Sequence, residues 1–465
     1  MKKAIKILIG ILLVLGIYVA LTHADEIQNL TYSVKTQIYG EPIDKETGLI
    51  NNDFFSINGE GKNPNSTTKG INEAIQYASK NNIEYIQLKK GIYLINGNTT
   101  NYNNFETAQK KGIILESNIT LDLNGSTIQH ISSSYPNYAV FSVTDVQNVE
   151  ISNGIIIGDK YTHDYTTSST HEWGFGIDVK GSKDVIINNV QIKETTGDGI
   201  ILGDYTNEEY TENVIIRNCK ITDCRRQGIS IVCAENVHIS ENEIDNIKGT
   251  TPQSSIDIEP YSPFQHVKNV VIENNIFYNN ASGIAVAFSG DSQNINVLNN
   301  KMTNAGVVCS NFNGNANVGY NYIINATVWI YGKKIENSNR KESVNIYNNQ
   351  IENSDVLIGN MANVILMNNQ IQDKGIRITA SNIAIANNIF STSKQNDYAL
   401  EYFWGEDTHQ NYICYISENT YKGNFYIKEK IDNRDNLQIS TVKEETDNFI
   451  KNIIEEELWN QISQK

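Results

Sequence analysis

Short aliphatic strands followed by one or two asparagines recur along most of this chain. The first clear copy is VEISNGI, ending at Ile155, and a late copy is IAIANNIF, ending at Phe390. Seven similar phrases lie between them, at a period that varies between about 20 and 35 residues, a range typical of solenoids and propellers. Units this short cannot bury a hydrophobic face alone, so we expect neighbouring units to stack.

The asparagines indicate which kind of solenoid forms. Asparagine tolerates the left-handed backbone region of a tight turn, and stacked asparagines can hydrogen-bond to one another as a ladder. We therefore predict an all-β fold, a right-handed parallel β-helix, in preference to a leucine-rich repeat, a propeller or a β-sandwich. The expected column is Asn153, Asn189, Asn218, Asn274, Asn299, Asn348, Asn368 and Asn387, with Glu241 and Tyr322 filling two gaps.

The two ends of the repeat carry patterns of their own. Residues 67–430 are predicted to form the solenoid, with residues 25–66 as a polar, extended lead-in and residues 431–465 as a C-terminal cap. A helix is expected from about Asn65, because Ile71, Ala74, Ile75 and Ala78 follow at helical spacing. Apolar residues among acidic ones after Phe449 predict an amphipathic helix that caps the other end, or that binds a partner.

Charge and leader pattern restrict partners and location. The chain of 465 residues has a formal net charge of −16, which argues against nucleic acid and anionic membrane surfaces as partners. Residues 1–24 combine Lys2, Lys3 and Lys6 with an apolar run, as a signal peptide or N-terminal anchor does. We expect a secreted or cell-surface protein that meets a membrane only through this segment, if it is not cleaved.

The five cysteines leave two interpretations open. They are Cys219, Cys224, Cys233, Cys309 and Cys414, without the pair spacing of a zinc site. A disulfide between neighbouring coils, such as Cys219 with Cys233, is one interpretation. Apolar filling inside the coils is the other.

Several phrases also resemble a known family. TTKGINEAIQYASKNN followed by IEYIQLKKGIYLI is similar to the start of pectate-lyase-like β-helix proteins, and THEWGFGI, GDGIIL, RRQGISI and GTTPQSSIDIEP resemble a bacterial subgroup of them. The resemblance spans nearly the whole chain after the leader. It implies a right-handed β-helix that acts on or binds a polysaccharide, and it leaves a homotrimer open, as in phage tailspikes. Because the superfamily contains lyases, hydrolases, epimerases and binding proteins, it does not fix the chemistry.

Strand alternation predicts a polar patch across three coils. If Ile177, Ile200, Ile229 and Ile256 point inward, then Asp178, Ile201, Ser230 and Asp257 share one outward column. Glu259 falls in the next outward column and Asp198 and Gln227 in a third, with Arg226 beside it. The predicted catalytic residues are therefore Asp198, Arg226, Gln227, Asp257 and Glu259.

This patch suits four functions. Elimination on a uronate needs a base and a cation or Arg226 to neutralise the carboxylate, and an epimerase shares that proton abstraction. An inverting hydrolase needs two separated carboxyl groups, such as Asp198 and Asp257. A binding module would only hydrogen-bond a glycan, and a surface ion pair between Arg226 and Asp257 is the alternative without function. We expect cleavage of an acidic glycan, by β-elimination more than by hydrolysis.

Two long loops should border the patch. The loop over residues 158–173 carries Asp164 and Glu172, and we expect its aromatic and imidazole side chains to contact sugar or donate a proton. The second loop follows the strand at Ile256. The predicted substrate-binding residues are Tyr161, His163, His171, Trp173, Asp178 and Tyr261.

Calcium is the one candidate cofactor. Asp257 and Glu259 could hold it, and so could the acidic segment GDYTNEEYTEN, with Asp204, Glu208, Glu209 and Glu212. That segment lacks the spacing of a calcium loop, so a solvated acidic turn is the alternative. We assign no residue as a metal ligand.

Overall fold

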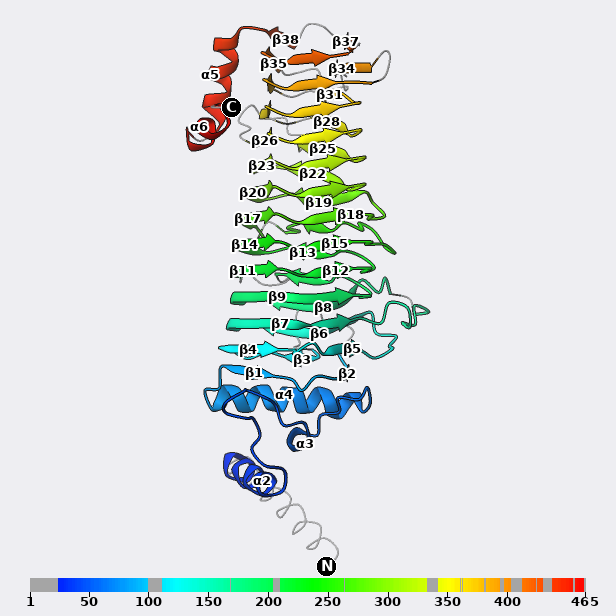
Figure 1. The fold of residues 1–465 in the computed structure, drawn as a ribbon, viewed down its shortest axis with the longest axis vertical. Coiled ribbons are helices and arrows are strands. Elements are labelled where there is room, and N and C mark those ends of the chain that lie inside the picture. The colour runs from blue at the N-terminus through cyan, green and yellow to red at the C-terminus, as the bar shows by residue number, and fades with distance from the viewer. Residues whose placement is uncertain are drawn as a thin grey trace, which may run out of the picture.

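The chain folds into one long solenoid of stacked coils (Figure 1). The computed structural model describes residues 24–98, 111–167, 169–203, 210–262, 264–332, 342–359, 361, 363–379, 382–393, 397–402, 412–423, 425–429, 437–454 and 456–463. The predicted leader, apart from Ala24, lies outside the described residues. Within these ranges, no helix is both long and apolar enough to cross a membrane.

Each coil contributes up to three short strands, and each strand pairs in parallel with its counterpart in the next coil. The first face contains β1 (Tyr85–Gln87), β4 (Ile119–Asp122), β7 (Gln147–Ile157), β9 (Lys183–Lys193), β11 (Thr211–Arg217), β14 (Ala234–Ser240), β17 (Val267–Glu273), β20 (Ser292–Leu298), β23 (Asn315–Gly319), β26 (Ser343–Tyr347), β29 (Asn363–Met367), β32 (Asn382–Ala386), β35 (Tyr412–Ser417) and β38 (Leu437–Ser440). The second face contains β2 (Ile92–Ile95), β5 (Thr127–His130), β12 (Lys220–Thr222), β15 (Glu243–Asp245), β18 (Ile276–Tyr278), β21 (Lys301–Thr303), β24 (Tyr322–Ile324), β27 (Gln350–Glu352), β30 (Gln370–Gln372), β33 (Ile389–Ser391) and β36 (Thr420–Lys422). Because β7 and β9 continue around the corner, these two faces form one sheet of 25 strands.

The third face is a separate sheet of 13 strands. It contains β3 (Ile113–Ile114), β6 (Asn137–Thr144), β8 (Trp173–Lys180), β10 (Ile200–Leu202), β13 (Ile229–Ile231), β16 (Ile256–Ile258), β19 (Ile284–Ser289), β22 (Gly306–Phe312), β25 (Thr327–Gly332), β28 (Asp355–Gly359), β31 (Ile376–Thr379), β34 (Asp397–Tyr402) and β37 (Phe425–Glu429). Isoleucine and valine fill the space between the faces, as buried parallel strands require. The predicted inward positions Ile177, Ile200, Ile229 and Ile256 are all fully buried.

The asparagine ladder forms one residue beyond the predicted column. The predicted positions adopt the left-handed conformation at the corner between the first two faces, with φ of 54° at Asn299 and 57° at Asn274. The following residue turns inward instead. Its side-chain nitrogen donates to the side-chain oxygen of the next coil at 2.9–3.1 Å, in the series Asn242, Asn275, Asn300, Asn321, Asn349, Asn369, Asn388 and Asn419.

Two details of the predicted column need correction. The gap assigned to Tyr322 belongs to Tyr320, which has φ of 58°, whereas Tyr322 begins β24. The side chains of Asn153 and Asn189 do hydrogen-bond to each other, at 2.9 Å. In these two coils, however, the position that holds the inward asparagine in later coils is occupied by Gly154 and Val190. The buried ladder therefore begins only at Asn242.

Helices cover the N-terminal end. The helix α4 (Pro64–Lys80) lies across the first coil (Figure 1) and buries Ile71, Ala74, Ile75 and Ala78, as expected. The lead-in differs from the extended segment that we predicted, because it contains α2 (Ala24–Tyr39) and α3 (Asn52–Phe55). Phe54 and Phe55 are buried, so this segment belongs to the cap.

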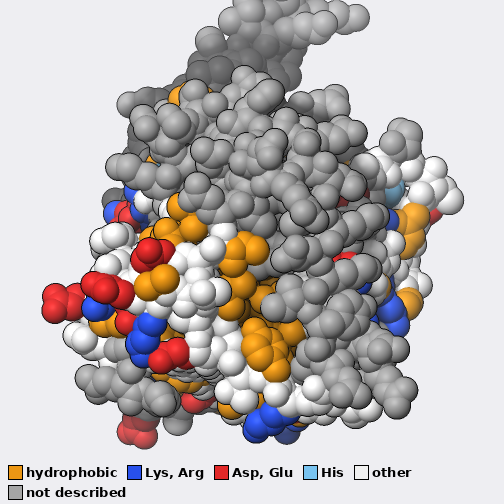
Figure 2. All heavy atoms as spheres, turned by 90° about the horizontal axis from the view of Figure 1, so that it is seen from above, with side chains coloured by type: hydrophobic (Ala, Val, Ile, Leu, Met, Phe, Trp, Pro, Cys, Tyr) orange, Lys and Arg blue, Asp and Glu red, His pale blue; other side chains and the backbone are white. Residues whose placement is uncertain are grey.

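The C-terminal helices lie along the side of the last coils. Ile450 of α5 (Lys443–Ile453) and Ile462 of α6 (Glu456–Ser463) pack in one cluster with Ile365 and Ala384 on the outer side of the first face. The predicted amphipathic helix is therefore present, beside the last coils (Figure 1). The view from above shows acidic and basic side chains interspersed at one visible edge (Figure 2).

All five cysteines are free and buried. The structure therefore supports apolar filling and does not form the Cys219–Cys233 disulfide. Burial raises the pKa of the Cys219 thiol to about 11, which keeps it protonated and unreactive at neutral pH.

Candidate functional site

The third face carries the predicted outward column in the predicted register. Ile201 of β10 pairs with Asp178 of β8 and with Ser230 of β13, and Ser230 pairs with Asp257 of β16. The next coil places Ala287 at this position, so the polar column ends there. Strand alternation alone was thus sufficient to align these side chains.

Arg226 is the centre of the polar cluster. Its Nη1 lies 3.2 Å from Asp198 Oδ2, and its Nη2 donates to Glu259 Oε1 at 2.9 Å. A third carboxylate, that of Glu172, lies 3.9 Å from Nε. The guanidinium is therefore held between carboxylates from three coils. Its partners are Asp198 and Glu259, where the sequence suggested an ion pair with Asp257.

Gln227 joins the remaining members of the cluster. Its Nε2 donates to Asp257 Oδ2 at 2.6 Å and contacts Glu259 Oε1 at 3.3 Å. Ser230 donates to Asp198 Oδ2 at 2.7 Å and also contacts the Gln227 side-chain oxygen. All five predicted catalytic residues therefore lie in one hydrogen-bonded group, which we call the Arg226 cluster together with Glu172 and Ser230.

Burial governs protonation in this cluster. Asp198 is fully buried, and burial raises its pKa to about 6 although Arg226 and Ser230 act in the opposite direction. Burial and the nearby Glu259 charge raise the pKa of Asp257 well above its usual range, again against Arg226. Glu172 and Glu259 keep some exposure, with 26% and 19% of their side-chain surfaces accessible. Protonated and ionised carboxyl groups can therefore coexist at neutral pH.

The predicted substrate-binding residues are placed unequally. Tyr261 follows Glu259 by two residues and is 63% exposed, and burial and the Glu259 charge raise its pKa. Trp173 is half-buried and packs against an outward apolar strip of Ala139, Phe175, Ile201 and Val232. Tyr161 lies apart, because its hydroxyl donates to Asp223 at 2.6 Å. Asp178 pairs with Lys180 at 3.2 Å, on the far side of Ile201 from Ser230.

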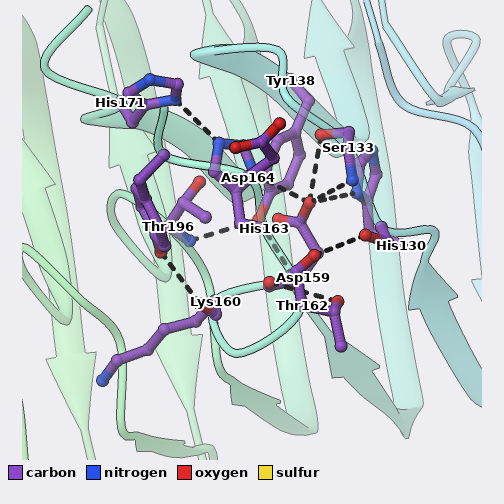
Figure 3. A network of polar contacts seen from close by, with 12 residues as sticks. His130, Ser133, Tyr138, Asp159, Lys160, Thr162, His163, Asp164, His171 and Thr196 are labelled. Carbon is purple, nitrogen blue, oxygen red and sulfur yellow. Dashed lines mark hydrogen bonds and ion pairs between the residues drawn. The ribbon is translucent and has the colours of Figure 1, made fainter. Parts of the chain in front are cut away.

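The two loop histidines are part of a buried network (Figure 3). His163 Nδ1 lies 2.9 Å from Asp159 Oδ2, and His163 Nε2 lies 2.8 Å from His171 Nδ1. Both rings are more than nine-tenths buried, so they stabilise the loop and are not exposed to contact a sugar, contrary to our expectation. Burial lowers the pKa of His171. Burial would raise the pKa of Asp159, but its contacts with His130 and His163 prevail and lower it.

The network fixes the loop that delivers Glu172 to the cluster. Arg225 donates to the backbone oxygen of His171 at 2.9 Å, and its guanidinium lies 4.9 Å from the centre of the Tyr165 ring. Glu172 follows His171 directly and so comes to lie beside Arg226. The sequence placed Glu172 on the loop and Ser230 in the column, but only long-range contacts assign them to the cluster.

No calcium site emerges from the described part of the chain. Within it, no three His, Cys, Asp or Glu side chains are arranged to hold a metal ion. Most of the acidic segment, including Asp204, Glu208 and Glu209, lies outside the described residues. Glu212 is described and pairs with Lys183 at 3.1 Å.

The fold defines a class of protein, the right-handed parallel β-helix proteins. Residues 90–255 match the family model described as "Right handed beta helix region". The chain is 33% identical over 364 residues to the SPbeta prophage-derived uncharacterized protein YorA of Bacillus subtilis (strain 168). That match covers 72% of this chain and 59% of the relative, so the chain spans little more than half of that protein.

Two solved structures show the same fold at low identity. The A-module of the mannuronan C-5 epimerase AlgE6 of Azotobacter vinelandii superposes with a TM-score of 0.52 at 13% identity, covering 83% of this chain and 97% of that one. A mutant tailspike protein of E. coli bacteriophage HK620, in complex with a pentasaccharide, gives a TM-score of 0.52 at 12% identity over 82% and 78% of the chains. The scaffold is thus shared with carbohydrate-active and carbohydrate-binding proteins.

Proposed function

We propose that this protein is a glycan-cleaving enzyme whose active centre is the Arg226 cluster. One observation carries the proposal: the carboxyl groups of Glu172, Asp198 and Glu259 surround one arginine on a sheet face, and Asp257 joins them through Gln227. The outward column has an apolar residue, Ile201, within the patch and Ala287 just beyond it. The fold likeness to an epimerase of mannuronan and to a tailspike bound to a pentasaccharide supports a glycan as substrate.

The contacts favour hydrolysis over the β-elimination that the sequence suggested. Arg226 is held between Asp198 and Glu259, which stabilises its charged form and makes it a poor base. Its charge is also already matched by carboxylates, so it is poorly placed to neutralise a uronate. A centre with four carboxyl groups and one guanidinium suits a neutral sugar better than an acidic one.

Asp257 and Glu259 fit the two roles of a glycoside hydrolase. Gln227 Nε2 lies 2.6 Å from Asp257 Oδ2 and 3.3 Å from Glu259 Oε1, so these two oxygens are no more than 5.9 Å apart. Carboxyl groups about 5–5.5 Å apart are typical of retaining enzymes. Asp257 would donate its proton to the glycosidic oxygen while the Glu259 carboxylate attacks the anomeric carbon. Water, deprotonated by Asp257, would then release the sugar from Glu259.

The test is a screen of the purified protein against neutral and uronate polysaccharides, with and without calcium. We expect new reducing ends without the near-ultraviolet absorbance of an unsaturated sugar. Asp257→Asn should lower the rate by about 10²-fold or more, since acid–base groups contribute 10²–10⁴-fold. Glu259→Gln removes the nucleophile and should lower the rate at least as much. Glu352→Gln serves as the matched control, because Glu352 pairs with Tyr322 on another face.

Three outcomes would overturn this assignment. An absorbance rise abolished by the same variants would establish elimination at this cluster. Cleavage unaffected by either variant would place the active centre elsewhere. Binding of a glycan without any product would make the protein a binding module. Circular dichroism of each variant separates loss of chemistry from loss of fold.

A further inference from the structure

A second polar surface lies on the first face, away from the Arg226 cluster on the third. It is a groove of about 590 Å³ between the C-terminal helices and the outer side of β20, β23 and β26. This volume lies within the range of small-molecule sites. Amide side chains on and beside these strands line one side of the groove, and Ile453, Ile454 and Leu458 line the other.

Three asparagines in register form the floor of the groove. Asn296 pairs with Asn317 across the strands, and Asn317 pairs with Asn345. The Asn345 side-chain nitrogen donates to Asn317 at 2.9 Å, and that of Asn317 donates to Asn296 at 2.8 Å. The Asn317 and Asn345 amides therefore each keep a second N–H for a ligand, whereas the Asn296 nitrogen donates to Asn294 Oδ1 at 3.0 Å.

The end of this floor has an acceptor that lacks a donor. Asn345 is only 7% exposed, and its Oδ1 has no hydrogen-bond donor among the described residues. The next coil places Ile365 at this position, so the series of amides cannot continue. A buried acceptor without a donor costs about 1–3 kcal/mol. The oxygen itself is enclosed, so a ligand hydroxyl could supply this donor only if the side chains that cover it move aside.

The lining selects the chemistry of the ligand. Among the lining residues that the structure describes, none carries a formal charge, which disfavours uronates, phosphates and charged peptides. Seven amide side chains offer alternating donors and acceptors, and Ile453, Ile454 and Leu458 form an apolar wall. An extended peptide fits less well, because β23 already pairs with β20 and β26 on both sides. A neutral sugar matches both sides of the groove, because its hydroxyl groups can bond to the amides and its ring can pack against the apolar wall.

We propose that this groove binds a neutral oligosaccharide, as a site separate from the Arg226 cluster. It does not depend on the function proposed above. If both hold, one glycan polymer can be anchored at the first face while another segment is processed at the third.

The test is isothermal titration calorimetry of the Asp257→Asn protein with neutral hexasaccharides of glucose, mannose, galactose and N-acetylglucosamine. A hexagalacturonate and an uncharged strand-forming peptide are the comparison probes. We expect at least one neutral hexasaccharide to bind, with affinity lowered about tenfold or more by Gln293→Ala and by Asn317→Ala. Gln350→Ala, an exposed glutamine on the second face, should change it less than twofold.

Gln293 is exposed and lies at the rim, so its variant tests the site even if Asn317→Ala disturbs the fold. Binding that survives both groove variants would overturn the proposal, as would binding of the hexagalacturonate or the peptide alone. Absence of binding by all four neutral sugars would overturn it as well. Because the assay uses a protein without Asp257, its result is independent of catalysis.

Discussion

Asparagine performs three different tasks in this protein, according to its place in the coil. Asn299 supplies the left-handed turn, with φ of 54°. Asn300, one residue later, points inward and hydrogen-bonds between coils. Asn317 points outward and lines the groove of the first face. The same side chain thus provides conformation, internal bonding and recognition, because strand alternation and turns aim it differently.

Asp198 should make stability depend on pH in a defined direction. Its folded-state pKa of about 6 exceeds the ordinary 3.8, so between these values only the folded state keeps the proton. The free energy of unfolding therefore falls as pH rises from about 4 to about 7, and the full contribution of this group is present below pH 4. Asp198→Asn removes this dependence. The free energy of unfolding of the variant, relative to that of the wild type, should therefore be about 2–3 kcal/mol higher at pH 7 than at pH 4.

Urea unfolding at the two pH values measures this difference. The comparison uses the change with pH, so a constant cost of losing the ion pair with Arg226 cancels. A difference between variant and wild type that stays the same at both pH values would contradict the assignment of the proton to Asp198.

The residues of the cluster were predictable from sequence only where strand geometry fixes them. Asp198, Gln227 and Asp257 follow from alternation and coil alignment, and all three lie in the cluster. Glu172 does not, because its place depends on Arg225 and on the buried histidines. Local pattern carries no information about such contacts between a loop and a distant turn.

At the scale of the element, the corner between the first two faces is the most constrained part of each coil. Asn300 accepts from the backbone and side-chain nitrogens of Asn275, and its own nitrogen donates to Asn321 and to the backbone oxygen of Ile272. Periodicity predicted this corner, but it assigned the ladder to the wrong member of the pair. The left-handed residue turns the asparagine that follows it toward the interior. Alignment of the repeats shows that both positions recur but not which of them faces inward.

The ladder predicts a sharp contrast between adjacent substitutions. Asn300→Ala leaves several buried backbone and side-chain groups without partners, and should lower stability by about 3–5 kcal/mol. Asn299→Ala keeps those bonds and removes only the residue suited to the left-handed turn, so it should lower stability by about 1–2 kcal/mol. Native-state hydrogen exchange of the neighbouring coils measures both. Equal losses for the two variants would show that the ladder adds nothing beyond the turn.

At the scale of the whole molecule, the solenoid behaves as a one-dimensional stack in which each coil contacts its neighbours. N-terminal helices cover the first coil, while α5 and α6 pack beside the last ones. Loops and end helices bring together residues that are distant in sequence, as Glu172 and Ile450 show.

Deletion of one complete coil should be tolerated. Asn300 and Asn321 are equivalent residues separated by 21 positions, so removal of residues 301–321 joins two equivalent points. The shortened chain should keep its β-sheet circular dichroism and melt within about 5 °C of wild type. Deletion of residues 301–310, part of one coil, shifts every later strand out of alignment and should give an unfolded or aggregated protein. Similar behaviour of both deletions would contradict independent coils.

The inner ladder also has a direction, and that direction suits synthesis on the ribosome. The backbone and side-chain nitrogens of Asn242 both donate to an oxygen of Asn275, which leaves the ribosome later. Each finished coil thus offers two N–H groups to the ladder asparagine of the next coil. A register slipped by one residue would bring there either the preceding residue, which adopts the left-handed turn, or the first residue of the following strand, such as Ile276 or Lys301. Each new coil can therefore pair in register with the preceding coil before the next one is synthesised, so the chain can fold from its N-terminus during translation.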